Sequence, residues 1–530
     1  MKTKLLFKTR KSPFYFLLVP FVLIFFITSS CKEQTEATKS PIALSPDIPV
    51  DVDPVLQAEL KAKNDNYYQL NQAFNKYSWQ AIVAIFWPYG KDQKPMPSFT
   101  DKGKPYWLTW KEAMQVYRPD GGEPAKWDGK RIGKDLGLEN GAVAEEDIRI
   151  YLSSETPAHK GKAKFRNFAD ETDQAFAGEL FDQNGNVVLY EVLMNKAEYE
   201  YLVANKLYNI NGQIEFTSKN QIANFPPGDF KTNQVGAVEI KFAWKVLQET
   251  DIKERYFVNK GYVVDEKTKK LVIKDLGMIG FHISQKTPTG KQWVWSTFEQ
   301  IDNLDQNVVD INGIKKTIHP TLTDPNCELC PVNINVVDAN GTPTTFTYNS
   351  NEHSNYWLIK DNPTKFYANT NIFKTQAKRM IDIPVRVQDL NKEMQAYFKS
   401  QNSVFQYYQL IDTQYPIDQN VLPANSTEKG YKLPESATNK PGGNPNLAFL
   451  TNITMETFFQ IGNQPASAFM EANPKSDIQV FGTESCMGCH SSAGIYNGVG
   501  KNNTPTTLPQ LSGDFSWLLT QKAQWYKPKK

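Results

Sequence analysis

A short motif near the C-terminal end constrains this chain more than any other feature. Residues 486–490 read Cys-Met-Gly-Cys-His, a C-x-x-C-H pattern, in a sequence of 530 residues with five cysteines and five histidines. At that composition the pattern arises by chance in roughly 5 of 10,000 sequences of this length. It is typical of a haem attachment site, a zinc site or a local disulfide. Because only 40 residues follow the motif, the upstream chain has to supply most of its surroundings.

The start of the chain has the order of a secretory signal. Basic residues without any acidic one occupy positions 2–11, an uncharged run follows at 13–28, and two serines precede Cys31. The uncharged run is shorter than the ~20 residues that a membrane-spanning helix needs. The segment resembles a bacterial lipoprotein signal, in which residues 1–30 are removed and Cys31 carries the lipid; an uncleaved anchor is the alternative. The polar, Pro-rich residues 31–55 are then expected to form a tether.

Export changes how the charge and the cysteines are interpreted. Without the five basic residues of the leader, 54 basic residues face 57 acidic ones, a formal charge of −3. With no basic patch in the sequence, a nucleic-acid partner has no support. A location in the periplasm or on the cell surface, held to the membrane by the lipid anchor, permits disulfides and thiol-linked haem.

The chemistry of the motif favours covalent haem c over the alternatives. Cys486 and Cys489 would add across the two vinyl groups of one haem, and His490 would ligate the iron from the proximal side. A zinc site would need Cys327 and Cys330, which 155 residues separate from Cys486, against the usual ~15–20 in zinc ribbons. A disulfide between the two cysteines of the motif leaves the histidine unexplained.

The second C-x-x-C pair, Cys327 and Cys330, lies between two Pro-containing turns. A local disulfide that pins this loop is the simplest interpretation. A redox-active disulfide that exchanges electrons with the haem is the alternative.

Sequence periodicity predicts an α+β fold with a strand-rich body, flanking helices and a small helical C-terminal haem c segment. A hairpin is expected at 181–192 around Asn184-Gly185. The other predicted strands lie at 235–247, 255–274 and in a 276–300 hairpin, and the helices at 55–86, 104–117, 196–209, 452–462 and 515–524, the last capped by Ser512 or Asp514. The predicted regions are a body at 56–425, a linker or surface loop at 426–447 and a haem-binding region at 448–530.

The sixth ligand of a haem iron cannot be a methionine or histidine downstream, because neither follows His490. It comes from upstream, from a donor such as Tyr496 or Lys501, or is absent; a vacant position allows small-molecule chemistry, whereas two strong ligands favour electron transfer. His159, His319 and His353 are expected in loops, and Met455 and Met470 are expected to fill the core.

Of the upstream donors, His282 is the candidate distal ligand. Strand alternation places it on one face with Met278, Gly280 and Ser284, and Ile279, Phe281 and Ile283 on the other. A glycine within a strand often marks a close approach of a ligand or backbone. Trp293 and Trp295 on the returning strand could complete a wall. The alternative is a histidine that only makes a hydrogen bond on a half-buried face.

Several segments together resemble a family of large exported bacterial proteins described as cytochrome c family proteins. They are SWQAIVAIFWP at 78–88, GFHISQKTPTGKQWVWSTFEQIDN at 280–303, LTNITMETFFQ at 450–460, SCMGCH at 485–490 and DFSWLL at 514–519. The resemblance covers roughly residues 70 to 520. It implies a single haem c held by Cys486, Cys489 and His490, and names no substrate.

Three functions are compatible with these features. The first is a lipid-anchored monohaem cytochrome in electron transfer, with a redox partner protein or a small-molecule donor or acceptor. The second is a haem-dependent, peroxidase-like oxidoreductase with a substrate pocket in the body, where Glu299 and Asp302 could act, although surface carboxylates are the commoner interpretation. The third is a ligand-binding lipoprotein in which the haem is structural or a sensor.

Overall fold

The computed structural model describes residues 39–63, 68–129, 149–150, 179–264, 271–311, 313–326, 332–333, 374–379, 381–416, 451–457, 486–490, 493–508 and 511–527. The chain divides into two compact units, Met1–Thr38 and Lys39–Lys530, and everything below concerns the second. Several predicted features lie outside the described residues: Cys31, Cys327, Cys330, His159, His353, Met470 and the 426–447 linker. None of the described helices is both long and apolar enough to span a lipid bilayer.

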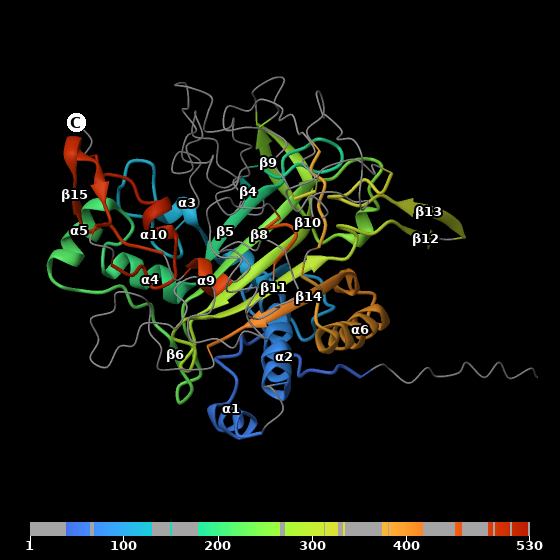
Figure 1. Ribbon diagram of the computed structural model, residues 1–530. Helices are drawn as coiled ribbons and strands as arrows, with labels where there is room; N and C mark the ends of the chain where they lie inside the picture. The colour runs from blue at the N-terminus through green and yellow to red at the C-terminus, as the bar shows by residue number, and fades with distance from the viewer. Residues whose placement is uncertain are drawn as a thin grey trace, which may run out of the picture. The chain divides into compact units, whose positions relative to one another are not determined.

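An eight-stranded sheet forms the centre of this unit (Figure 1). Seven of its strands are antiparallel, and the short β4 runs parallel to β9. The main path is β14-β11-β10-β8-β5-β3, and β9 pairs with the first half of β10. The strands are β3 (Lys111–Glu112), β4 (Arg149–Ile150), β5 (Leu189–Met194), β8 (Val238–Val246), β9 (Val258–Val264), β10 (Leu271–Gln285), β11 (Val294–Gln300) and β14 (Tyr408–Gln414).

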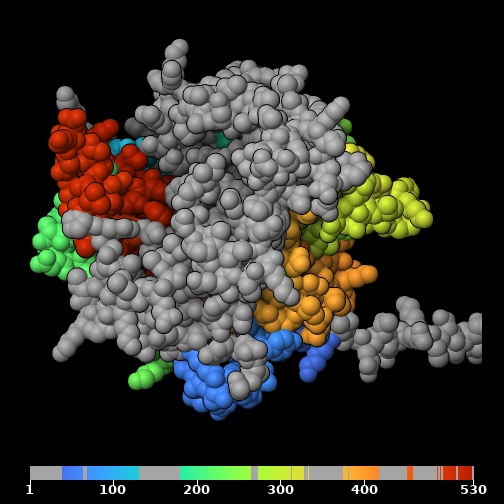
Figure 2. All heavy atoms as spheres, in the orientation of Figure 1, coloured from blue at the N-terminus to red at the C-terminus, as the bar shows by residue number. Residues whose placement is uncertain are grey.

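The remaining strands of the described residues form four separate two-stranded pairs, of which the one at residues 307–311 and 314–318 projects at the surface (Figure 2). Helices of 3 to 18 residues accompany the strands. The pairs are β1 (Pro88–Tyr89) with β2 (Lys104–Pro105), β6 (Gly228–Asp229) with β7 (Gln234–Val235), β12 (Asn307–Ile311) with β13 (Ile314–Ile318), and β15 (Gly498–Val499) with β16 (Pro505–Thr506). The helices are α1 (Pro54–Lys61), α2 (Tyr68–Ile85), η1 (Tyr106–Thr109), α3 (Ala113–Val116), α4 (Lys196–Ala204), α5 (Ile210–Ser218), η5 (Lys253–Arg255), α6 (Val385–Ser400), η7 (Val404–Tyr407), α9 (Cys486–His490), η8 (Lys501–Asn503) and α10 (Leu518–Gln521). This arrangement confirms the α+β class.

The two faces of the sheet are covered differently. On one face α2 and α6 contact β14 (Figure 1) and close an aromatic core in which Trp79 packs edge-on against Phe298, which stacks on Phe281. On the opposite face Tyr190 and Ala243 pack against the segment 451–457. Large aromatic side chains fill the face covered by α2 and α6. The candidate functional residues described below lie on the opposite face.

A β-bulge in β10 corrects the predicted alternation. The pairing of β10 with β8 shifts between Met278 and Gly280. The extra residue turns Met278 into the same core as Phe281 and Ile283, and Ile279 into the core of the opposite face. His282 and Gly280 keep their shared face, since the bulge lies before both.

Other local predictions have mixed outcomes. The turn at Asn184-Gly185, helix α4 and the hairpin of β10 and β11 are confirmed. The predicted helix at 104–117 is wrong, because that stretch forms β2, η1, β3 and α3 in succession. The C-terminal helix is only α10, and its N-cap is Trp517, whose side chain makes no capping hydrogen bond, in place of the predicted Ser512 or Asp514. The described start of the predicted helix at 452–462 is a turn.

Candidate functional site

Helix α9 carries the C-x-x-C-H motif and lies beside the ends of β11 and β14. Cys486 and Met487 are buried in the main core, and the Met487 N–H donates to Gln414 Oε1 at 3.1 Å. Cys489 lies three positions after Cys486 in the same helix, and its side chain is outside the described residues. Packing of the buried part of α9 fixes the direction in which His490 leaves the helix.

The imidazole of His490 has a defined tautomer. Its Nδ1 lies 2.7 Å from the carbonyl oxygen of Phe515, and a carbonyl only accepts, so Nδ1 carries the proton. Nε2 then holds a lone pair and has no hydrogen-bond partner among the described residues. Burial, helped by the charges of His282 and Lys241, lowers the pKa of His490 to about 3, against the opposing effect of its hydrogen bond to Phe515. The ring is therefore neutral at neutral pH, the form that binds metal ions.

Trp295 and His282 lie on the sheet face next to His490. The Trp295 ring is 4.3 Å from the His490 ring between centroids, and the indole N–H donates to Gln292 O at 2.9 Å. His282 lies opposite Thr297 in the ladder of β10 and β11. The structure thus brings together residues from α9, β10 and β11 that the sequence separates by about 200 positions.

His282 also has an unused ring nitrogen. Its Nε2 lies 2.9 Å from Glu456 Oε1, whereas Nδ1 is buried without a hydrogen-bond partner within the described structure. Because the carboxylate is the acceptor, Nε2 carries the proton. Nδ1 then holds a lone pair that no described donor contacts. A buried acceptor without a partner is costly, so this nitrogen is suited to bind a group that the structure does not contain.

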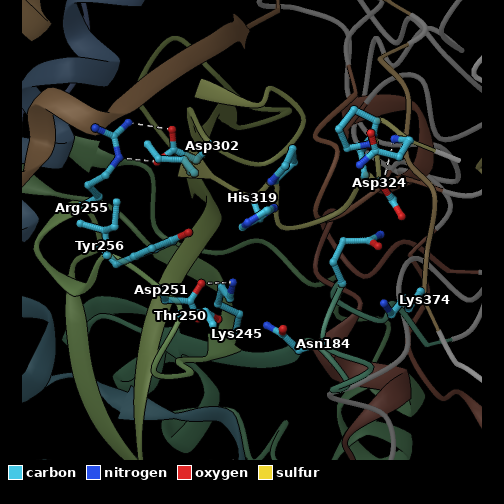
Figure 3. Close-up of a pocket in the computed structure, with 17 residues that line it drawn as sticks. Asn184, Lys245, Thr250, Asp251, Arg255, Tyr256, Asp302, His319, Asp324 and Lys374 are labelled. Carbon is cyan, nitrogen blue, oxygen red and sulfur yellow. Dashed lines mark hydrogen bonds and ion pairs between the residues drawn. The ribbon is translucent and has the colours of Figure 1, made fainter. Parts of the chain in front are cut away.

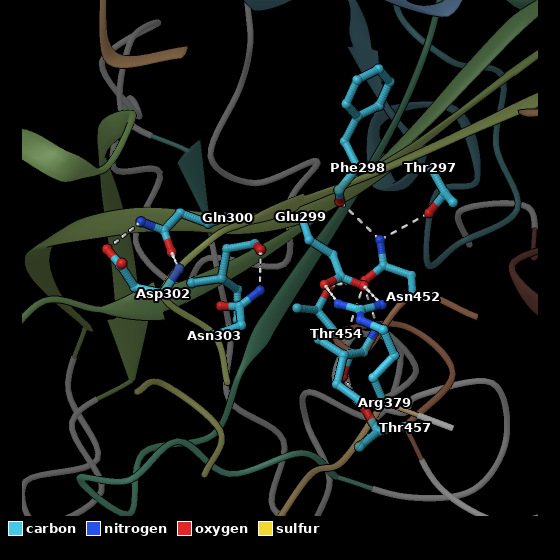
Figure 4. A network of polar contacts seen from close by, with 12 residues as sticks. Thr297, Phe298, Glu299, Gln300, Asp302, Asn303, Arg379, Asn452, Thr454 and Thr457 are labelled. Carbon is cyan, nitrogen blue, oxygen red and sulfur yellow. Dashed lines mark hydrogen bonds and ion pairs between the residues drawn. The ribbon is translucent and has the colours of Figure 1, made fainter. Parts of the chain in front are cut away.

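The segment 451–457 is fixed across the same face by polar contacts (Figure 4). Asn452 donates to Thr297 Oγ1 and to Phe298 O, both at 2.9 Å, and the Ile453 N–H donates to Glu299 Oε1 at 2.7 Å. These contacts place Glu456 beside His282. They also explain Gly280, where an added Cβ would lie 2.2 Å from Thr454 Oγ1. The close approach predicted at this glycine is made by the chain itself.

Gly280→Ala should therefore displace the segment 451–457 and lower the free energy of unfolding by about 1–3 kcal/mol. Adding Thr454→Ala removes the clashing hydroxyl and should recover part of the loss in a double-mutant cycle measured by chemical denaturation. Gly500→Ala is the control, because its nearest neighbour would be at 3.5 Å. Equal effects of the two glycine substitutions would contradict the close packing inferred here.

Glu299 and Asp302 are not surface carboxylates, which corrects the commoner interpretation of the sequence. Both are fully buried. Glu299 forms an ion pair with Arg379 (Figure 4), and Asp302 accepts from Arg255 through both oxygens, at 2.6 and 2.7 Å. Each carboxylate is thus paired with an arginine, and each also lines one of the two cavities described below. No local pattern indicates the two arginines as their partners.

Two polar cavities lie elsewhere in the described structure. One of about 330 Å³ is walled by Lys245, Arg255, Asp302, His319 and Lys374 among others (Figure 3). In it Lys245 pairs with Asp251 at 2.8 Å, so much of its charge is already balanced. The other, of about 490 Å³, lies beside Glu299 and Arg379. Neither is lined by His282 or His490.

The other predicted donors are distant from this arrangement or already engaged. His319 is exposed at the first cavity, and Met455 is a buried core residue, as predicted. Tyr496 donates its hydroxyl to Thr520 O at 2.9 Å, and Lys501 is exposed. Of the predicted donors, His282 is the one whose charge lowers the pKa of His490.

No protein-family model matches the chain, and no curated protein or solved structure is significantly similar to it. The resemblance to cytochrome c family proteins therefore stays a prediction from the motifs.

Proposed function

We propose that this chain is an exported, lipid-anchored monohaem c-type cytochrome that takes part in electron transfer. Cys486 and Cys489 form the thioether links, His490 is the proximal ligand, and Cys31 carries the lipid. The observation that carries the proposal is the tautomer of His490: the Phe515 carbonyl holds the proton on Nδ1, and Nε2 has no hydrogen-bond partner among the described residues.

This tautomer of His490 fits a haem iron, because it leaves Nε2 as the ring nitrogen that can bind. Ligating histidines usually donate their second ring N–H to a carbonyl or carboxylate, which fixes the ring and increases its basicity. His490 does so to Phe515, and His282 does so to Glu456. When bound, the haem would supply a one-electron couple between ferric and ferrous iron.

Two available lone pairs, on His490 Nε2 and His282 Nδ1, favour electron transfer over catalysis. Protein ligands on both sides of an iron leave no open position for a substrate, and His282 Nδ1 is the buried acceptor suited to the second position. The Trp295 ring beside His490 excludes water from that side of the imidazole. The redox partner is a protein or a small-molecule donor or acceptor that reaches the membrane-tethered chain.

The test is the absorption spectrum of the purified full chain, oxidised and reduced, with and without carbon monoxide. We expect a reduced α-band, haem staining that survives denaturing gels, and a spectrum that carbon monoxide leaves unchanged. His282→Ala should open one position, so that carbon monoxide then binds. His319→Ala, which changes an exposed histidine at another site, should behave as the unmodified chain.

Each alternative has its own outcome. A high-spin iron that binds carbon monoxide in the unmodified chain would favour the haem-dependent oxidoreductase. An unaltered spectrum of His282→Ala would remove the assignment of the distal ligand. Absence of covalent haem after expression with the maturation machinery would refute the function itself, and Cys486→Ser with Cys489→Ser provides the haem-free reference.

A further inference from the structure

Glu198 is a buried carboxyl group that none of the contacts above explains. It is fully buried in the first turn of α4, and neither of its oxygens has a hydrogen-bond partner in the described structure. A glutamate at this position often accepts from the N-cap N–H. Here the N-cap is Asn195, whose N–H already donates to Val238 O. The carboxyl therefore faces the interior without that bond.

Glu198 interacts electrostatically with a second carboxyl and with a phenol from other elements. The charges of Glu239 on β8 and Asp514 both raise the pKa of Glu198, after burial. Burial likewise raises the pKa of Glu239 to about 7, against the opposing effects of a hydrogen bond from Ser516 and of the charge of Lys241. The Tyr117 hydroxyl is buried without a hydrogen-bond partner within the described residues, and the charges of both glutamates raise its pKa after burial.

The third carboxyl, Asp514, is already neutralised. Lys286 pairs with it, and the Phe225 N–H donates to it at 2.6 Å. Lys241, the other cation facing this cluster, lies over the Tyr190 ring at 4.7 Å. Burial disfavours a negative charge on either Glu198 or Glu239, and the charge of Glu239 raises the pKa of Glu198 further, so one proton is expected to stay on the two carboxyls together.

One peptide unit connects this pair to the C-x-x-C-H motif. The Phe515 carbonyl accepts from His490 Nδ1, and the next residue, Ser516, donates its hydroxyl to Glu239 Oε2 at 3.1 Å. A positive charge on an iron bound by His490 would act on Glu239 through this path and through the low-dielectric interior. Glu239 is half-buried, unlike Glu198, so it gives the pair access to solvent.

We propose that Glu198 and Glu239 form a proton-binding pair that releases one proton when the iron ligated by His490 is oxidised. This inference rests on the proposed function. On oxidation one electron leaves the iron for an external one-electron acceptor, and one proton leaves the O–H bond of the pair for solvent through Glu239. On reduction both return.

The test measures the midpoint potential of the haem-containing chain against pH with redox mediators. At full coupling the midpoint potential of a one-electron couple falls by about 59 mV per pH unit around pH 7. This corresponds to a tenfold rise per pH unit in the ratio of oxidised to reduced protein at a fixed potential. Glu239→Gln and Glu198→Gln should flatten this slope. Asp182→Asn, at a buried carboxyl outside the cluster, should keep it.

A second measurement follows the protonation of the carboxyls directly. The infrared absorbance of the protonated carboxyls should titrate in the unmodified chain and shift between the oxidised and reduced forms, and the component that titrates near pH 7 should be lost in Glu239→Gln. Ser516→Ala keeps both carboxyls and should weaken the coupling, which covers the case in which a glutamate variant does not fold.

The outcomes separate this inference from the function on which it rests. A haem-containing chain with a pH-independent potential, or with the same slope in all variants, overturns the coupling alone. A chain without covalent haem overturns the coupling and the proposed function together.

Discussion

Lys286→Met is expected to lower the free energy of unfolding by about 3–5 kcal/mol at neutral pH, because it leaves the buried Asp514 carboxylate without its cation. Lys286 Nζ donates to Asp514 Oδ2 and to Asn224 Oδ1, and both charged side chains are almost completely buried. Chemical denaturation at several pH values measures the loss. The effect matters for the site, because Phe515 follows Asp514 directly.

The pH dependence of this loss has a definite sign. Burial raises the pKa of Asp514, and the Lys286 charge opposes that rise. Without the lysine the folded-state pKa lies further above the unfolded value, so the variant is relatively more stable when the carboxyl is protonated. The deficit should therefore shrink as pH falls towards 4 and grow as pH rises.

Two controls test the cause of this loss. Lys392→Met breaks an exposed pair with Asp389 and should change stability by less than about 1 kcal/mol. Adding Asp514→Asn to Lys286→Met should recover part of the deficit, since no unpaired charge remains. A Lys286 variant as stable as the Lys392 variant would show that the buried pair contributes nothing.

His490→Gly should produce the largest change in the properties of the proposed haem. Loss of a supporting partner at a metal site typically costs about 10–100-fold in affinity or activity, and here the ligand itself is removed. We expect the covalent haem to remain on Cys486 and Cys489 while the low-spin spectrum is lost. Added imidazole should restore that spectrum by occupying the space beside the Phe515 carbonyl.

The reference for this experiment is His282→Ala, which should leave the proximal bond intact and respond to carbon monoxide instead. An unchanged low-spin spectrum of His490→Gly, without imidazole, would contradict the proximal assignment. Failure of imidazole to act would contradict the inferred role of the Phe515 carbonyl.

Local sequence patterns predicted those elements whose geometry depends on near neighbours. Asn184-Gly185 forms its turn because glycine accepts a positive φ there, 80°. The alternation in β10 and β11 predicted their pairing, with His282 opposite Thr297. The same alternation failed at Met278, because a one-residue bulge reverses the faces and leaves no mark in the hydrophobic pattern.

Predictions that needed a distant partner failed more often. Asp514 has the residue type and position of a helix cap, yet it pairs with Lys286 from the end of β10. Glu299 and Asp302 are of residue types that usually lie at the surface, yet both are buried in ion pairs with Arg379 and Arg255. No sequence pattern indicated Glu198 or Tyr117, because what distinguishes them is burial without a hydrogen-bond partner among the described residues.

The sequence by itself determined the α+β class, the main hairpins and the motif whose spacing indicates a covalent haem, because these depend on periodicity and on residues a few positions apart. Only the tertiary structure decided that Phe515 fixes the tautomer of His490, that His282 lies on the neighbouring strand face with one ring nitrogen unpartnered among the described residues, and that the serine after Phe515 donates to Glu239. Those relations join segments from across the chain, and packing of the whole sheet sets them.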